Sequence, residues 1–126
     1  MEGFDFVHGE TVRFRDVDAL GHVNNAVFLT YLEEARIAYL LPFGADVTNM
    51  ILARVEIDFR APLRSGDRLE IGVRTAAVGT KSFQLEYEVR SGNTLAAEAK
   101  TVLVSYDYET GSAVDVPQTW REALVA

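Results

Sequence analysis

The sequence has no cysteine and only two histidines, His8 and His22, among its 126 residues. The absence of cysteine excludes disulfides, a catalytic thiol, iron–sulfur clusters and zinc sites built on cysteine. Two histidines leave little for a histidine-rich metal site, and their spacing matches no metal-binding motif. We therefore expect no metal and no other cofactor.

Basic residues are also few, 12 against 19 acidic ones, which gives a net charge of −7. This is the wrong sign for a protein that binds nucleic acid through its whole surface. The longest apolar run, residues 26–43, is interrupted by polar side chains and falls short of the roughly 20 apolar residues that span a membrane. The N-terminal residues are acidic where a signal peptide carries Lys or Arg. We expect a cytoplasmic protein that binds neither nucleic acid nor membranes.

No linker, repeat or low-complexity tract divides the chain, so we expect a single domain over residues 1–126. Alternating apolar residues predict strands over residues 11–15, 51–60, 68–74, 83–90 and 94–106. An apolar run begins after Asn24 and Asn25, which are good helix caps, and it stops at Pro42 and Gly44. This pattern predicts a helix over residues 26–41, and Pro117 marks the start of a short terminal helix.

Short turns between the last four strands require antiparallel neighbours, because parallel strands need long crossovers. The predicted helix is apolar around most of its circumference, which indicates burial on several sides. Both patterns fit an α+β fold in which a curved five-stranded antiparallel sheet wraps around one long buried helix. One helix covers only part of such a sheet, so we expect dimerisation to cover more. In the last strand the apolar phase slips between Lys100 and Ser105, which indicates either a bulge or a segment covered on both faces.

Polar residues gather just before the predicted helix: Asp18, His22, Asn24 and Asn25, with Gly21 allowing a close backbone approach. The first N–H groups of a helix have no internal partner and carry the positive end of its dipole. They can therefore stabilise negative charge that develops on a substrate oxygen. By itself, however, an Asp before a helix is more often a cap or an Asx turn than a catalyst, and the two Asn residues are caps first.

The string DVDALGHVNN at residues 16–25, followed by YLEEAR at residues 31–36, resembles the signature of the 4-hydroxybenzoyl-CoA thioesterase family of hotdog-fold acyl-CoA thioesterases. Within it, GHVNN at residues 21–25 resembles the long-chain acyl-CoA thioesterase branch. The resemblance implies the hotdog fold, hydrolysis of an acyl-CoA thioester without a cofactor, and a homodimer or homotetramer. The active sites of this oligomer would lie where protomers meet.

The resemblance also implies residue roles. Asp18 would be the catalytic carboxylate, acting as the nucleophile or as the base that activates water, and Asp16 would support its position. The backbone N–H of Asn25 would bind the thioester oxygen, while His22 and Asn24 would orient Asp18 or water. So few groups suffice because a thiolate, with a free-thiol pKa of about 8.5, leaves without a strong general acid.

Other residues are expected to bind the substrate. Phe28 and Tyr31 would shape the acyl pocket. Five of the twelve basic residues lie between positions 60 and 81, and of these Arg64 and Lys81, in or beside turns, would bind the phosphates of CoA. A solvated strand face with ordinary Arg–Glu pairs explains each of these cations equally well.

Three alternatives stay open. A second hotdog subclass places its acid within the helix, where Glu33 falls, although Glu33 is otherwise a polar helix position that pairs with an arginine. A hotdog enoyl-CoA hydratase would carry D-x-N-P-x-H, whereas His22 follows Asp18 by four residues with no proline between them. The third alternative is a non-catalytic module that binds acyl-CoA.

Overall fold

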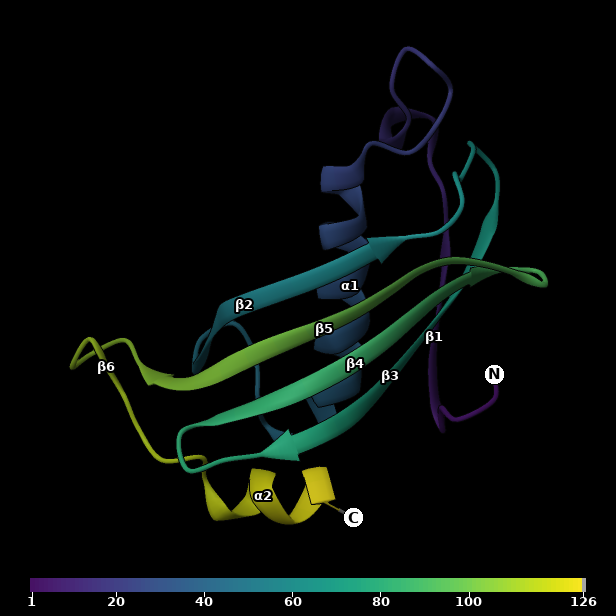
Figure 1. The fold of residues 1–126 in the computed structure, drawn as a ribbon. Helices are drawn as coiled ribbons and strands as arrows, with labels where there is room; N and C mark the ends of the chain where they lie inside the picture. Colours follow the sequence, from purple (N-terminus) through teal and green to yellow (C-terminus); the bar gives the residue numbers. More distant parts are fainter. Residues whose placement is uncertain (126) are drawn as a thin grey trace.

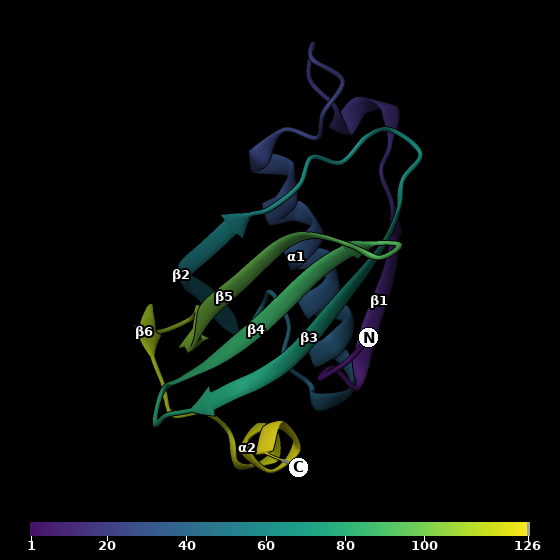
Figure 2. The ribbon, with the colours of Figure 1, turned by 45° about the vertical axis from the view of Figure 1, so that its right-hand side comes forward.

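The computed structural model describes residues 1–125 and contains one antiparallel sheet in the order β1-β3-β4-β5-β2. The strands are β1 (Phe6–Thr11), β2 (Met50–Phe59), β3 (Arg68–Val78), β4 (Ser82–Ser91) and β5 (Thr94–Asp107), and the two-residue β6 (Ser112–Ala113) pairs with β5. The long helix α1 (Asn25–Leu40) crosses one face of the sheet, which curves around it (Figures 1 and 2). The expected α+β architecture is confirmed, with β6 as an addition.

Helix α1 begins and ends within one residue of its predicted bounds. Asn24 caps it, since its side-chain oxygen accepts the Ala26 N–H at 2.9 Å. The short 3₁₀ helix η2 (Leu41–Phe43) follows, with Pro42 in its first turn, and Gly44 takes a φ of 86° that favours glycine. Most of the α1 circumference is buried or half-buried, as its composition predicts.

The hydrophobic core lies between α1 and the sheet. Its members from the helix include the fully buried Tyr31, Leu32 and Ala35, and those from the sheet include Ile71, Val73, Phe83, Leu85, Val89, Ala97 and Leu103. Each large side chain that leaves water contributes about 1.5–3 kcal/mol to folding, so this packing holds α1 firmly in place. The predicted terminal helix is α2 (Gln118–Val125), which buries Trp120 and Leu124 at the end of the sheet opposite the start of α1 (Figure 1). No helix within residues 1–125 is long and apolar enough to cross a membrane.

The predicted strand over residues 11–15 is wrong. β1 ends at Thr11, and a 3₁₀ turn, η1 (Phe14–Asp16), takes up the last two residues of the predicted range. The Asp16 carboxylate accepts the backbone N–H of Arg13 at 2.9 Å, which folds the chain back on itself. An alternation of two apolar residues is too short to distinguish a strand from such a turn, and Phe14 is in fact 83% exposed.

The alternation of apolar residues in β5 is interrupted because polar residues occupy two positions on the inward face of the strand. Thr101 and Ser105 are buried there, and the Thr101 hydroxyl lies 2.6 Å from the Tyr87 hydroxyl. Val102 is half-buried on the other face, and the pairing of β5 with β4 is continuous here. The segment is therefore covered on both faces, and the irregularity lies on β2, where Ala53 is skipped in the pairing.

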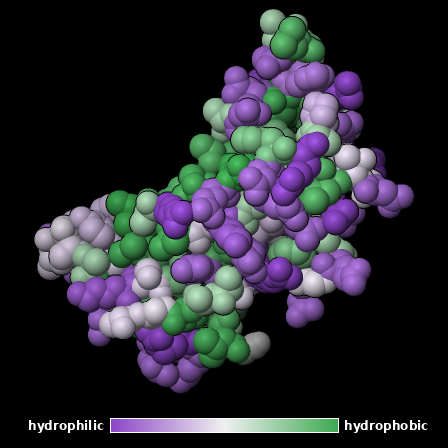
Figure 3. Space-filling view, viewed as in Figure 1, coloured by the Kyte–Doolittle hydropathy of each residue, from purple (hydrophilic) through white to green (hydrophobic). Residues whose placement is uncertain are grey.

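Strand β2 forms one edge of the sheet, and several of its apolar side chains are exposed beside the charged Arg54, Glu56 and Asp58. Ile51, Leu52, Val55 and Phe59 have exposed fractions of 41%, 39%, 36% and 44%. Within residues 1–125, no strand pairs with the outer edge of β2. Apolar side chains gather along this side of the molecule (Figure 3). Proteins usually protect a free sheet edge, and exposed apolar side chains on one are unusual.

Candidate functional site

An open cavity of about 510 Å³ lies between the start of α1 and the end of β2. Three segments line it, namely the loop before α1, the first turn of α1 and the residues at the end of β2: Asp18, His22, Val23, Asn24, Asn25, Phe28, Phe59, Arg60, Ala61 and Pro62. The fold therefore brings together five of the residues that the sequence predicts for the site. These are Asp18, His22, Asn24, Asn25 and Phe28.

The loop that carries Asp18 is closed by its own backbone. The Asp18 N–H donates to the His22 carbonyl at 2.8 Å, and the Gly21 N–H donates to the Asp18 carbonyl at 3.0 Å. Gly21 has a φ of 81°, a conformation that side chains other than glycine rarely adopt. Val17 and Val23 form a bridge at the base of the loop. Asp18 and His22 therefore keep fixed places in the cavity wall.

The two carboxylate oxygens of Asp18 have different surroundings. Oδ1 accepts the Leu20 N–H at 2.9 Å, which makes an Asx turn. Oδ2 has no hydrogen-bond donor within residues 1–125, and the side chain is exposed in the cavity wall. Asp18 thus forms the turn that its position predicts and still presents one oxygen to a ligand.

The start of α1 leaves one backbone donor available. Asn24 satisfies two of the first amides, because its side chain accepts the Ala26 N–H and its carbonyl accepts the Val27 N–H, each at 2.9 Å. The Asn25 N–H has no acceptor within residues 1–125. Asn25 lines the cavity, so this amide and the positive end of the helix dipole are placed to hold a negatively charged oxygen.

Asp16 does not line the cavity but is buried beneath the loop, with an exposed fraction of 4%. Its Oδ2 accepts the Arg13 N–H at 2.9 Å and the Tyr31 hydroxyl at 2.7 Å. Burial tends to raise the pKa of Asp16, but these hydrogen bonds outweigh it and hold the pKa below its ordinary value. The Asp16 carbonyl also accepts the Asn24 N–H at 3.1 Å, which ties the loop to the start of α1.

Three expected substrate-binding residues do not line the cavity of the protomer. Tyr31 is fully buried, and burial together with its hydrogen bond to Asp16 raises its pKa far above the ordinary value. Arg64 is exposed in the turn after β2, where its N–H donates to the Asp67 carboxylate at 2.9 Å. Lys81 is exposed in the turn between β3 and β4, near α2 and at the end of the sheet away from the start of α1 (Figure 1).

Two residues that the sequence pattern does not assign to the site also line the cavity, namely the last residue of β2 and the residue that follows it. Phe59 packs edge-to-face on Phe28, with 5.1 Å between ring centroids. Arg60 is the cation of the cavity wall, and its guanidinium donates to the Glu98 carboxylate at 3.0 Å. The sequence shows Arg60 among five clustered cations, but it does not show which strand end meets the helix.

Glu33, the alternative acid, does not line this cavity. It lies two turns beyond the start of α1, its side chain is 56% exposed, and it lies 3.6 Å from Arg36. The ion pair expected for a polar helix position is therefore confirmed. Within the protomer, Asp18 is the acid that shares a cavity with the start of the helix.

Comparison with known proteins places the chain in a family. Residues 12–124 match the family model described as the thioesterase-like superfamily. The chain belongs to this superfamily. The 1,4-dihydroxy-2-naphthoyl-CoA hydrolase of Rippkaea orientalis is 33% identical to this thioesterase over 125 residues, which cover 90% of this chain and 91% of that protein.

Similar solved structures also belong to thioesterases. A thioesterase from Thermus thermophilus, solved with coenzyme A and Zn, is 40% identical, with a TM-score of 0.91 over 98% of this chain and 94% of that one. A 1,4-dihydroxy-2-naphthoyl-CoA thioesterase from Synechocystis is 26% identical, with a TM-score of 0.84 over 95% of each chain. The expected hotdog fold and enzyme class, a thioester hydrolase, are confirmed. The long-chain branch stays a prediction.

Replacing Asp16 by Asn should lower the free energy of unfolding at pH 7 by about 1–3 kcal/mol, because the buried Tyr31 hydroxyl and the Arg13 N–H lose a charged acceptor. The folded chain lowers the pKa of Asp16, so the contribution of this carboxylate is present above the ordinary value of 3.8 and is lost as the pH falls through the folded value. Urea unfolding should therefore separate the variant from the wild type at pH 7 and less at pH 3. An equal difference at both pH values would contradict this account.

Proposed function

We propose that this thioesterase hydrolyses an acyl-CoA, with Asp18 as the catalytic carboxylate and the Asn25 backbone N–H as the oxyanion donor. One observation carries the proposal: a carboxylate oxygen and a helix amide, both without partners within residues 1–125, belong to residues that line the same cavity. A thioester carbonyl between them would meet a base or nucleophile on one side and a hydrogen-bond donor on the other.

The chemistry needs no further strong acid. As Asp18 takes a proton from water, the water oxygen attacks the thioester carbon and negative charge develops on the carbonyl oxygen, where the Asn25 N–H stabilises it. The C–S bond then breaks and CoA leaves as a thiolate, which later takes up a proton. If Asp18 instead attacks the thioester carbon directly, the C–S bond breaks, CoA leaves as a thiolate, and water then hydrolyses the mixed anhydride that joins the acyl group to Asp18. His22, in the same wall, would orient the water, and Asn24 holds the amide in place through its cap.

The apolar part of the cavity favours an acyl group that carries an aromatic ring. Phe28 and Phe59 already form an edge-to-face pair in the wall, and a third ring can extend such a pair. The relatives from Rippkaea orientalis and Synechocystis are named for a naphthoyl-CoA, which supports this choice over a long alkyl chain. The exposed Arg60 guanidinium is the group of the wall that suits a CoA phosphate.

We also propose that two copies associate through β2, giving a homodimer or a homotetramer of two such dimers. Pairing of β2 with the β2 of a second copy would satisfy the free edge and cover Ile51, Leu52 and Val55. Phe59 ends the same strand and Arg60 follows it, and both line the cavity. The partner would therefore close the open side of the cavity, so that each active site lies where protomers meet.

Replacing Asp18 by Asn should reduce hydrolysis of acyl-CoA by about 10²- to 10⁴-fold while the fold is kept, because the Asn oxygen can still accept the Leu20 N–H. Release of free thiol, followed with a thiol-reactive dye, measures the rate. The matched variant Glu33→Gln removes the acid on α1 and should stay near the wild-type rate. Activity kept by the first variant and lost by the second would move the catalytic acid to the helix.

Aromatic acyl-CoA substrates should be hydrolysed with a kcat/KM about fivefold above that of palmitoyl-CoA, since ring contacts in the pocket contribute about 1 kcal/mol. Phe59→Ala should lower the rate on the aromatic substrates more than on palmitoyl-CoA. A preference for the long alkyl chain would refute the proposed acyl group, but it would leave the role of Asp18 untouched.

Replacing Val55 by Lys, in the middle of β2, should give a monomer with reduced hydrolysis, because a charge on this edge opposes strand pairing. Sedimentation velocity measures the oligomeric state, and circular dichroism checks that the protomer stays folded. Thr119→Lys adds the same charge at an exposed position of α2 and should leave the assembly intact. A dimer that persists in the β2 variant would show that the copies meet elsewhere.

A further inference from the structure

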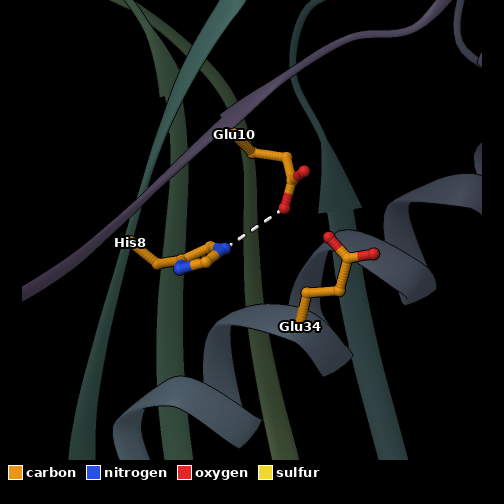
Figure 4. A group of neighbouring side chains, drawn as sticks. All are labelled: His8, Glu10 and Glu34. Carbon is orange, nitrogen blue, oxygen red and sulfur yellow. Dashed lines mark hydrogen bonds and ion pairs between the residues drawn. The ribbon is translucent and has the colours of Figure 1, made fainter.

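A cluster of three metal-binding side chains lies between β1 and α1 (Figure 4). His8 and Glu10 are two residues apart on β1, so both side chains point to the face that α1 covers, and Glu34 reaches them from α1. The Nε2 atom of His8 lies 3.1 Å from Oε2 of Glu10. One ligand atom from each of the three side chains lies within 4.8 Å of the other two, and all three residues are half-buried.

The proposed hydrolysis makes no use of this cluster. Glu34 lies nine residues beyond Asn25, which places it about 13 Å farther along the helix axis at 1.5 Å per residue. None of the three residues lines the cavity that contains Asp18. The close approach of these three side chains therefore needs an explanation other than the proposed hydrolysis.

Two carboxylates side by side in a half-buried place repel each other. A hydrogen bond to the adjacent Glu10 carboxylate, then burial and the negative charge of Glu10, raise the pKa of Glu34, and the positive charge of Arg13 offsets this in part. A divalent cation between the carboxylates would replace repulsion by two attractive contacts and would use the imidazole as a neutral third ligand.

We propose that His8, Glu10 and Glu34 form a binding site for a divalent transition-metal ion, with Zn²⁺ as the best fit. Zn²⁺ binds imidazole nitrogen and carboxylate oxygen at about 2.0–2.2 Å, which puts tetrahedral ligand atoms about 3.4 Å apart. The separation of 3.1 Å between His8 and Glu10 is close to this value. Rotation of the flexible Glu34 side chain completes the set and leaves a fourth position for water.

The donor set argues against Mg²⁺ and Ca²⁺, which prefer six or more oxygen ligands. The ion would link β1 to α1 and so stabilise the folded chain, because the unfolded chain does not hold the three ligands together. Its role would be structural, since it lies away from the proposed catalytic groups.

The test uses the full chain without a histidine tag, stripped of metal with a chelator. Isothermal titration with Zn²⁺ at pH 7 should show one ion per chain, and the thermal unfolding midpoint should rise by several degrees. His8→Gln and Glu34→Gln should each weaken binding by at least about tenfold. The matched variants His22→Gln and Glu33→Gln make the same chemical changes outside the cluster and should bind as the wild type does.

Loss of binding in Glu34→Gln will not reflect unfolding, because this change removes one of two repelling carboxylates. Without metal, its thermal midpoint should equal or exceed that of the wild type. No binding by the wild type, binding that survives both cluster variants, or binding that depends on His22 would each overturn the proposal. Mg²⁺ that binds as tightly as Zn²⁺ would also contradict the assigned ion class.

Discussion

The buried side chain of Asp16 fixes the position of the site. Its carboxylate accepts the Tyr31 hydroxyl from inside α1, and its backbone carbonyl accepts the N–H of Asn24, the residue that caps the same helix. Residues 18–21 of the loop between them are exposed, so the loop geometry depends on this anchor, on the buried Val23 and on the hydrogen bonds across its base. Asp18 and the Asn25 amide thus keep their positions because a neighbouring residue is buried and has no contact with the cavity.

The helix and the long strands could be predicted because their patterns extend over many residues. Sixteen residues of α1 lie between clear start and stop signals, and β2 alternates over ten residues. The first strand was misplaced because the alternation around Val12 covers only two apolar residues, and a hydrogen bond to Asp16 decides in favour of a turn. Asp18, His22, Asn24 and Asn25 were also accessible from sequence, since they are close neighbours along one loop and helix start.

The remaining site residues depend on which elements meet in space. Phe59 and Arg60 reach the cavity because β2 ends beside the start of α1, more than thirty residues away in sequence. Lys81 was expected near the substrate, but β3 has eleven residues and spans about 36 Å, which carries the following turn to the far end of the sheet. Glu34 faces Glu10 because β1 and α1 meet in space, and the spacing of the two histidines along the sequence gives no sign of that pair.

Different parts of helix α1 serve the proposed catalysis and the stability of the fold. Its first amide is free of internal partners, so chemistry that needs a donor is confined to that end, where the chain is exposed. Its middle turns supply buried side chains to the core on one side and a carboxylate toward β1 on the other. Any ion held there would strengthen the contact between β1 and α1 with only a weak effect on the electrostatics of the helix start, because about 13 Å of helix lies between them and salt screens charges over about 10 Å. Substitutions in the metal cluster can therefore change the stability of the folded chain with little effect on the proposed hydrolysis.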